Sequence, residues 1–255
     1  MKRPISQVHD FPDQPASAPR RTCDSCVVRG KAICAGLQSE ELSGLNQIAR
    51  HRRLKAGQKI ISDQDLPDYF AIVLSGSAKL TKVLPDGRQQ IVGLLFPSDF
   101  VGWPFESHGS SHAEAATDMQ LCSFPAAAFE RLVKQHSGIQ HQLFRNAFTQ
   151  IEAAQDWMLL LGRMTAREKV ANLFVMIARR SRGLDSCEFD SSGRERFDLP
   201  LSRSDTADFL GLTLETVSRQ FRALKSEGII RLDGTRTVTI LDPIKLAAAA
   251  TSPFI

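Results

Sequence analysis

The spacing of hydrophobic residues changes along the chain, and the changes divide it into units. Leu42, Leu45 and Ile48 recur every three residues, which predicts a short amphipathic helix. From about 52 to 124 the apolar residues fall in short runs between turn residues, which predicts β-strands. From about 126 to 163 the helical period returns and predicts a long helix.

The strand-rich segment is punctuated in a way that favours a β-barrel. Strands are predicted at 69–74, 78–84 and 90–96, and Pro85-Asp86-Gly87 is a hairpin signal. Strands this short, with turns this frequent, are typical of a jelly roll rather than of a sheet that alternates with helices. The predicted fold class is therefore α+β, with a jelly-roll β-barrel in the N-terminal half.

The predicted long helix carries a narrow apolar stripe. Its members recur at spacings of three and four, like the a and d positions of a coiled coil: Phe144, Ala147, Ile151, Ala154, Met158 and Leu161. A stripe this narrow favours a seam with a second copy over packing on the chain's own barrel, so we expect a homodimer. Glu152 and Asp156 fall on outward positions, and the seam carries no charge.

Residues 201–224 have the pattern of a helix-turn-helix. The signals, in chain order, are a cap with a capping-box partner, a small residue, a turn glycine and a second cap: Ser202 with Asp205, Ala207, Gly211 and Thr213. Apolar residues of the second helix share one face and are expected to pack inward: Val217, Phe221 and Leu224. An Asp-Gly turn between 229–232 and 236–241 predicts a β-hairpin, which makes the motif a winged helix-turn-helix.

The opposite face of the second helix predicts binding to double-stranded DNA. Four of its residues can point into a major groove: Glu215, Ser218, Arg219 and Arg222. The Arg219 guanidinium can bond guanine O6 and N7, and Glu215 can accept a hydrogen bond from cytosine N4. Thr216 and Lys225 are better placed to contact phosphates. The arrangement indicates sequence-specific recognition of an operator.

Composition is that of a globular protein of two ordinary domains. The 255 residues are 42% hydrophobic and 24% charged. No apolar run approaches the ~20 residues of a membrane span, and no secretory signal follows Met1, so we expect a cytoplasmic protein with no membrane partner. The net charge of +4 is too small to indicate nucleic acid by itself. The predicted units are a disordered tail at 1–20, a cysteine loop and helix at 21–50, a barrel sensor domain at 51–125, a dimerisation helix at 126–163 and a DNA-binding domain at 164–255.

Three of the five cysteines lie close together in the sequence. Cys23, Cys26 and Cys34 fall within a short segment, and in a reducing compartment such clustering points to a metal or redox centre rather than to disulfides. Cys122, on the last predicted barrel strand, could complete a set of four. Four thiolates suit either a zinc ion or an iron–sulfur cluster, and the spacing alone does not choose between them. Cys187 lies alone in a polar loop and is given no role.

The order of barrel, seam helix and winged helix-turn-helix resembles the CRP/FNR superfamily of bacterial transcription regulators. The resemblance covers nearly the whole chain from Cys23 onward. Its most specific part is Glu215-Thr-Val-Ser218-Arg219, which is similar to the Glu-x-x-Ser-Arg signature of the FNR branch. Similarity to that branch implies that the operator consists of DNA half-sites of the form TTGAT and ATCAA. Leu214 stands where the cyclic-AMP-responsive branch has an arginine that makes a further guanine contact.

The resemblance also implies what the barrel and the cysteine loop bind. It implies a barrel like that of cyclic-nucleotide-binding proteins, but Ser111-His112-Ala113-Glu114 lacks the Arg-Ser pair that grips a cyclic phosphate, so we expect no cyclic nucleotide. FNR proteins that sense oxygen hold a [4Fe–4S] cluster on three N-terminal cysteines and one barrel cysteine. This implies a cluster on four residues here: Cys23, Cys26, Cys34 and Cys122. Seven residues separate Cys26 from Cys34, more than in the best-known form of the family, so the loop must bulge further.

The implied function is an oxygen-responsive regulator of low-oxygen genes. With its cluster intact it would dimerise, bind palindromic operators and act through RNA polymerase, for which the predicted loop at 84–88 is a candidate contact. One alternative is a regulator of the same fold without a cluster, which is independent of an effector or senses haem or thiol redox state. Another is an enzyme on the jelly roll, but His108 and His112 lie in a Gly/Ser loop without the ligand spacing of a metal oxygenase. We therefore expect no enzyme.

Overall fold

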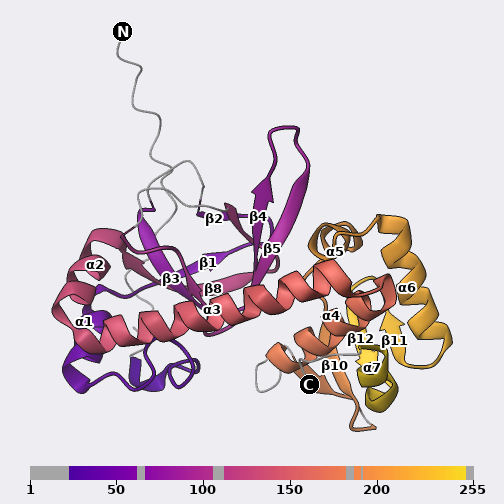
Figure 1. Cartoon of the computed structure of the whole chain (residues 1–255). Helices are drawn as coiled ribbons and strands as arrows, with labels where there is room; N and C mark the ends of the chain where they lie inside the picture. Colours follow the sequence, from indigo (N-terminus) through magenta and orange to yellow (C-terminus); the bar gives the residue numbers. More distant parts are fainter. Residues whose placement is uncertain (1–22, 62–66, 106–111, 182–186, 191, 251–255) are drawn as a thin grey trace.

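A computed structural model describes residues 23–61, 67–105, 112–181, 187–190 and 192–250. The long helix α3 (Ser137–Arg163) runs along an N-terminal β unit and ends at a smaller C-terminal unit (Figure 1). None of the helices in these ranges combines the length and the apolar run that crossing a bilayer requires. The tail predicted at 1–20 lies outside the described residues.

The N-terminal unit consists of two antiparallel sheets, each with four strands. Their orders are β1-β8-β3-β6 and β2-β7-β4-β5. The strand bounds are β1 (Arg50–Leu54), β2 (Lys59–Ile61), β3 (Tyr69–Ser75), β4 (Ala78–Val83), β5 (Gln89–Leu95), β6 (Phe100–Val101), β7 (His112–Ala115) and β8 (Met119–Pro125). The three strands predicted from the sequence are confirmed to within one or two residues, and so is the double-sheet architecture.

Strand β3 contributes to two apolar cores, which explains its unbroken hydrophobic run. Ala71 and Val73 face the core between the two sheets. Phe70 and Ile72 point the other way and pack with Phe129 of the helix that follows the barrel. Because successive side chains of a strand alternate between its faces, burial on both sides requires apolar residues at every position.

The segment from 126 to 163 forms two helices rather than the single helix expected. α2 (Ala126–Gln135) packs on the barrel through Phe129 and Val133, and α3 begins only at Ser137. His136 between them is extended, with φ −124° and ψ 107°, which ends one helix and lets the next leave in a new direction. Before the barrel lie a short 3₁₀ turn, η1 (Cys23–Ser25), and α1 (Ser39–Ile48).

In the described residues, the C-terminal unit combines four helices with one four-stranded sheet of order β11-β12-β10-β9. The bounds are α4 (Ala166–Ser181), β9 (Cys187–Phe189), β10 (Glu195–Asp198), α5 (Arg203–Leu210), α6 (Leu214–Ser226), β11 (Ile230–Asp233), β12 (Thr237–Ile240) and α7 (Pro243–Ala250). Cys187 was expected in a loop, but it begins β9 and pairs with Phe197 of β10. The helix α7 was not predicted, although Asp242 caps it by accepting a hydrogen bond from the Lys245 N–H at 2.9 Å.

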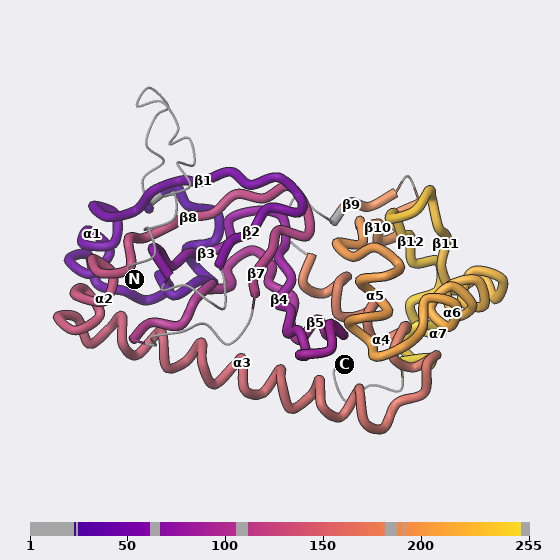
Figure 2. Tube along the Cα trace, turned by 90° about the horizontal axis from the view of Figure 1, so that it is seen from above, coloured from indigo at the N-terminus to yellow at the C-terminus, as the bar shows by residue number. Residues whose placement is uncertain are grey.

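The two units share side-chain contacts along β4 and β5. Figures 1 and 2 both show β5 next to α5. Polar bonds across this junction include Lys79 Nζ to Asp205 Oδ1 at 2.7 Å, Gln89 Nε2 to Asp208 Oδ2 at 2.6 Å, and Gln90 Nε2 to the Phe209 carbonyl at 3.1 Å. Arg180 of α4 also forms an ion pair with Asp99, which follows β5. The rings of Trp157, on α3, and Phe209 stack with centroids 3.9 Å apart. The DNA-binding motif is thus held against the barrel and α3 in a defined orientation.

Candidate functional site

The helix-turn-helix has the caps and the turn that the sequence predicts. The Ser202 hydroxyl accepts a hydrogen bond from the Asp205 N–H at 3.0 Å, and the Asp205 carboxylate accepts one from the Ser202 N–H at 3.1 Å. Gly211 adopts φ +60°, the left-handed conformation that favours glycine. Thr213 caps α6 by accepting a hydrogen bond from the Thr216 N–H at 3.2 Å. These local predictions are confirmed.

Helix α6 presents a polar face to solvent. Val217, Phe221 and Leu224 are buried against the core of the unit. The residues predicted to read DNA lie on the other face: Glu215, Arg219, Arg222 and Lys225 are exposed, and Thr216 and Ser218 are half-buried. Hydrogen bonds from its own backbone N–H and from the Thr213 hydroxyl hold the pKa of the Glu215 carboxyl below its usual range. Glu215 is therefore an anionic acceptor at neutral pH, as a contact to cytosine N4 requires.

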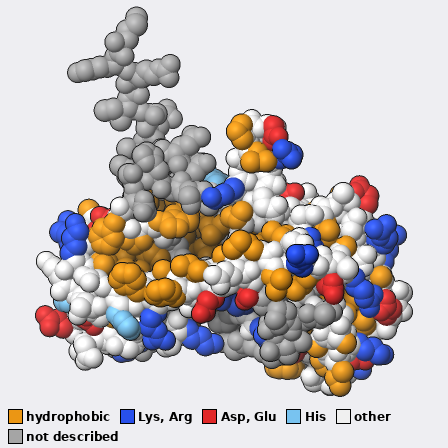
Figure 3. All heavy atoms as spheres, in the orientation of Figure 1, with side chains coloured by type: hydrophobic (Ala, Val, Ile, Leu, Met, Phe, Trp, Pro, Cys, Tyr) orange, Lys and Arg blue, Asp and Glu red, His pale blue; other side chains and the backbone are white. Residues whose placement is uncertain are grey.

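Two further features surround α6. The β11–β12 hairpin is the predicted wing, and its turn contains Gly234 at φ +67°. Figure 3 shows Lys and Arg side chains distributed over the end of the molecule that carries α6. Arg203, which the sequence analysis missed, lies in the first turn of α5 with its guanidinium 3.5 Å from the centroid of the Phe221 ring. Burial lowers the pKa of Arg203 to about 10.

Four cysteines from two distant segments meet at one small cavity. Cys23, Cys26 and Cys34 come from the loop before α1, and Cys122 lies in the middle of β8, paired with His51 of β1 and with a residue of β3. The cavity measures about 20 Å³. Its other lining residues are Val28, Arg29, Leu45, Ile72, Leu74 and Phe124. The fold thus brings together the four thiols that the sequence analysis grouped.

Burial dominates the electrostatics of this cavity. It raises the pKa of the Cys34 thiol to about 12, assisted by the neighbouring Cys23 and Cys26 and opposed by the charge of Arg29. Burial, and then the other three cysteines, also raise the pKa of Cys122. Cys23 Sγ donates to Asn46 Oδ1 at 3.4 Å. At neutral pH Cys34 and Cys122 are protonated thiols, so a metal centre would have to displace their protons on binding.

The donor set has the chemistry of a metal site. Within the described ranges, no three Cys, His, Asp or Glu side chains are arranged to hold a single metal ion. Four thiols around one cavity suit either a tetrahedral zinc ion or an iron–sulfur cluster. The cavity has room for about one water molecule, so the loop cysteines would move outward around a bound cluster while Cys122 stays on its strand.

The predicted seam of α3 is mostly exposed. Phe144, Ile151 and Met158 are 66%, 52% and 64% exposed, and Ala147 and Ala154 are exposed as well. Leu161, the sixth predicted seam residue, is half-buried and packs against the core of the C-terminal unit. The DNA-binding unit therefore partly covers the last of the six predicted seam residues.

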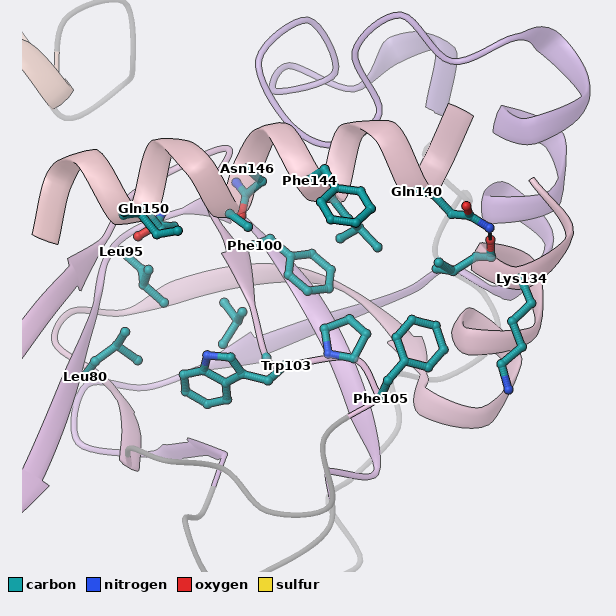
Figure 4. Close-up of a pocket in the computed structure, with 17 residues that line it drawn as sticks. Leu80, Leu95, Phe100, Trp103, Phe105, Lys134, Gln140, Phe144, Asn146 and Gln150 are labelled. Atoms are coloured by element: carbon teal, nitrogen blue, oxygen red, sulfur yellow. Dashed lines mark hydrogen bonds between the residues drawn. The ribbon is translucent and has the colours of Figure 1, made fainter. Parts of the chain in front are cut away.

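An apolar cavity of about 660 Å³ opens between α3 and the barrel (Figure 4). In Figure 4, Phe144 projects from the helix toward Phe100 of the barrel, and Gln150 lies above Leu95. Figure 3, in the orientation of Figure 1, shows hydrophobic side chains gathered on the surface above α3. Lys134 is the only charged residue among the described residues that line the cavity, and these include no arginine.

The remaining candidates do not form a site in the described structure. Ser111 and His108 lie outside the described residues. His112 is on β7, with its Nε2 3.9 Å from Glu114 Oε2. The backbone of Cys187 belongs to the sheet of the C-terminal unit, away from the cavity of the other cysteines.

Comparisons with known proteins agree with this architecture. Residues 51–136 match the cyclic nucleotide-binding domain, and residues 168–249 match the Crp-like helix-turn-helix domain. The transcriptional activator protein FnrL of Cereibacter sphaeroides is 46% identical over 89% of this chain and 91% of its own length. The nitrogen fixation regulation protein FixK of Bradyrhizobium diazoefficiens is 34% identical over 89% and 93%. The structure of FixK2 from Bradyrhizobium japonicum superposes with a TM-score of 0.70 at 28% identity, over 80% of this chain and 98% of that one. These relatives are regulators rather than enzymes, and the chain belongs to the CRP/FNR family of transcription regulators.

Proposed function

We propose that this chain is an oxygen-responsive transcription activator whose DNA binding depends on a [4Fe–4S] cluster. Four cysteines would hold the cluster: Cys23, Cys26, Cys34 and Cys122. The observation that carries the proposal is their convergence on one buried cavity from a loop and from a strand. Three of them lie close together in the sequence, but Cys122 is far from them and reaches the cavity only through the fold.

The cluster would join the cysteine loop to the barrel. When bound, the cluster would be held by four iron–thiolate bonds and would supply an oxygen-sensitive group. Leu45, Ile72 and Phe124 wall the cavity with apolar surface and limit the access of water. A structural zinc and thiol redox sensing are the alternative roles for the same four cysteines.

The proposed output is binding of a homodimer to a palindromic operator. The exposed apolar residues of α3 would meet those of a second copy, since a two-fold axis brings like faces together. Two α6 helices could then enter major grooves about 34 Å apart. Arg219 and Glu215 would read a guanine and a cytosine in half-sites of the TTGAT and ATCAA type, while Thr216 and Lys225 contact phosphates.

Two further parts of the proposal concern partners of the barrel. The tip of the β4–β5 hairpin stands clear of the molecule in Figure 1 and exposes Val83 and Leu84, so it is a candidate contact for RNA polymerase. The cavity between α3 and the barrel is apolar and its described lining has no arginine. A cyclic phosphate would have no bidentate partner there, so we expect no response to cyclic nucleotides.

The test is anaerobic reconstitution of the full-length protein with iron and sulfide. We expect about four iron atoms per chain and a visible absorption band that air exposure bleaches, together with loss of operator binding. Serine variants of Cys23, Cys26, Cys34 and Cys122 should each lose iron, because a site that lacks one ligand becomes labile. Cys187→Ser is the matched control and should load fully.

Three results would contradict the proposal. Retention of one zinc per chain would indicate a structural metal, and a haem spectrum would indicate another sensor. Full operator binding by the iron-free protein, unaffected by air, would indicate a regulator without a cluster. Full iron loading of Cys122→Ser would show that another residue supplies the fourth ligand.

A further inference from the structure

One buried carboxylate joins the segment that carries the cysteines to the first turn of α3. Glu41, on α1, is 8% exposed. Its Oε2 accepts a hydrogen bond from the Gln38 N–H at 2.9 Å, at the start of α1. Its Oε1 accepts a hydrogen bond from the Gly138 N–H at 2.9 Å, in the first turn of α3. Gln38 follows Cys34 closely, so one side chain spans from the cysteine loop to the long helix.

The site is built for a negative charge. The N-termini of α1 and α3 both point N–H groups at the same carboxylate, and the dipoles of both helices favour an anion there. The residue that precedes α3, His136, makes no side-chain cap, so Glu41 supplies the cap that the local sequence lacks. Gly138 leaves room for this contact, because a Cβ at this position would overlap both carboxylate oxygens of Glu41 and displace them.

We propose that Glu41 is a positioning residue that couples the cysteine site to the dimerisation helix. The inference rests on the proposed function, in which four ligands tie the loop to β8. While the loop is tied, the start of α1 is fixed and Glu41 holds the first turn of α3. When the ligands are lost, the loop and the start of α1 loosen, and the cap on α3 loosens with them.

The position of Gly138 makes the coupling effective. It precedes Phe144, the first residue of the seam, by less than two helical turns. A helix moves as a rigid element over such a length, so a shift of its first turn changes the angle at which the seam meets a second copy. The α1 contact therefore affects dimerisation without touching the partner.

Two variants break the contact in different ways. Glu41→Gln leaves one acceptor oxygen for two N–H donors and removes the charge. Gly138→Ala displaces the carboxylate, while alanine favours the helix and keeps α3 folded. The controls are Glu40→Gln, an exposed neighbour on α1, and Gly162→Ala, in the same helix with nothing within 4 Å of the added Cβ.

The experiment measures iron per chain, and it measures the dimer dissociation constant of loaded and of air-exposed protein by sedimentation equilibrium. Both variants should load iron as the wild type does. For each protein we take the dimer dissociation constant without iron and divide it by the constant with iron. In both variants this ratio should be roughly tenfold smaller than in the wild type, as expected for a lost charge-assisted hydrogen bond. The controls should keep the wild-type ratio.

The outcomes separate the inference from the proposed function. If the wild type shows a ratio well above one and both variants keep it, the coupling role of Glu41 is refuted and the cluster function stands. If the variants fail to load iron, Glu41 acts on the cysteine site itself, and the positioning role is refuted. If the wild type binds no iron or has a ratio of one, the proposed function fails, and the inference fails with it because there is no signal to transmit.

Discussion

The ion pair between Lys79 and Asp205 is expected to hold the DNA-binding unit against the barrel. Lys79 Nζ lies 2.7 Å from Asp205 Oδ1 and 3.3 Å from Glu114 Oε1. The side chains of Lys79, Asp205 and Glu114 are 19%, 23% and 28% exposed, so solvent screens them less than it screens a surface pair. Lys79→Ala would leave two carboxylates facing each other across the junction of the two units.

The free energy that the Lys79–Asp205 bond contributes can be worked out from its type. A hydrogen bond to a charged group contributes about 1.5–3 kcal/mol. Partial exposure places the Lys79–Asp205 bond near the lower end of that range, at about 2 kcal/mol. This corresponds to roughly a thirtyfold change in the docking equilibrium of the DNA-binding unit.

A double-mutant cycle measured by urea unfolding isolates this energy. The cycle combines Lys79→Ala with Asp205→Asn, and it subtracts the separate effect of Asp205 on the cap of α5. Lys82→Ala, on the same strand but exposed, is the control. A coupling energy of about 1–2 kcal/mol is expected. A value within a few tenths of zero, or an equal value for Lys82, would refute the interdomain role of the pair.

The pair also has a predictable pH dependence. Burial opposes the charged form of Lys79, but its bonds to Asp205 and Glu114 outweigh this effect and raise its pKa. Burial likewise opposes the charged form of Asp205, but bonds from Lys79 and Ser202 lower its pKa overall. The stabilisation should therefore be complete at neutral pH. It should be lost as the pH falls below about 4 toward the lowered pKa of Asp205, and again as the pH rises past the raised pKa of Lys79, above about 10.4.

Two other predictions concern recognition and assembly. Arg219→Ala should cost about 1–3 kcal/mol on the operator and relax selectivity at one guanine, whereas Lys225→Ala should weaken binding to every sequence and flatten its salt dependence. An equal loss on operator and scrambled DNA for Arg219→Ala, measured by fluorescence anisotropy, would contradict the base contact. Ala154→Asp should weaken the dimer more than its neutral isostere Ala154→Asn, because a two-fold seam brings two carboxylates together. Indistinguishable sedimentation of the two variants would place Ala154 outside the seam.

Features encoded by a few adjacent residues were predicted well. The caps and the turn of the helix-turn-helix depend on Ser202, Gly211 and Thr213, each of which acts within three or four residues of its own position. The same reasoning could have found α7, since Asp242 followed by Pro243 is a helix-start signal. It was missed because the apolar run behind that signal is short and consists mostly of alanine.

Features that depend on distant contacts could not be predicted in this way. The sequence does not distinguish Leu161 from the other seam residues, because only the docking of the C-terminal unit covers it. Glu41 has the pattern of an ordinary acid in the first turn of a helix, and its second partner, Gly138, lies 97 residues away. Cys122 could be grouped with the loop cysteines only because three partners exist, since a lone cysteine on a strand is more often a core residue. Its place at their cavity depends on the pairing of β8 with β1 and β3.

The path of the apolar core limits how this protein can be divided or recombined. Ile91 and Phe96, from the barrel, are 1% and 6% exposed and belong to the same core as Phe174 and Phe221 of the C-terminal unit. A fragment that begins near residue 164 would uncover this surface and should be prone to aggregation. Grafting the DNA-binding unit onto another sensor would require transplanting β4, β5 and the end of α3 with it. The functional boundary between the barrel and the DNA-binding unit is therefore not a boundary at which the protein can be divided into stable fragments.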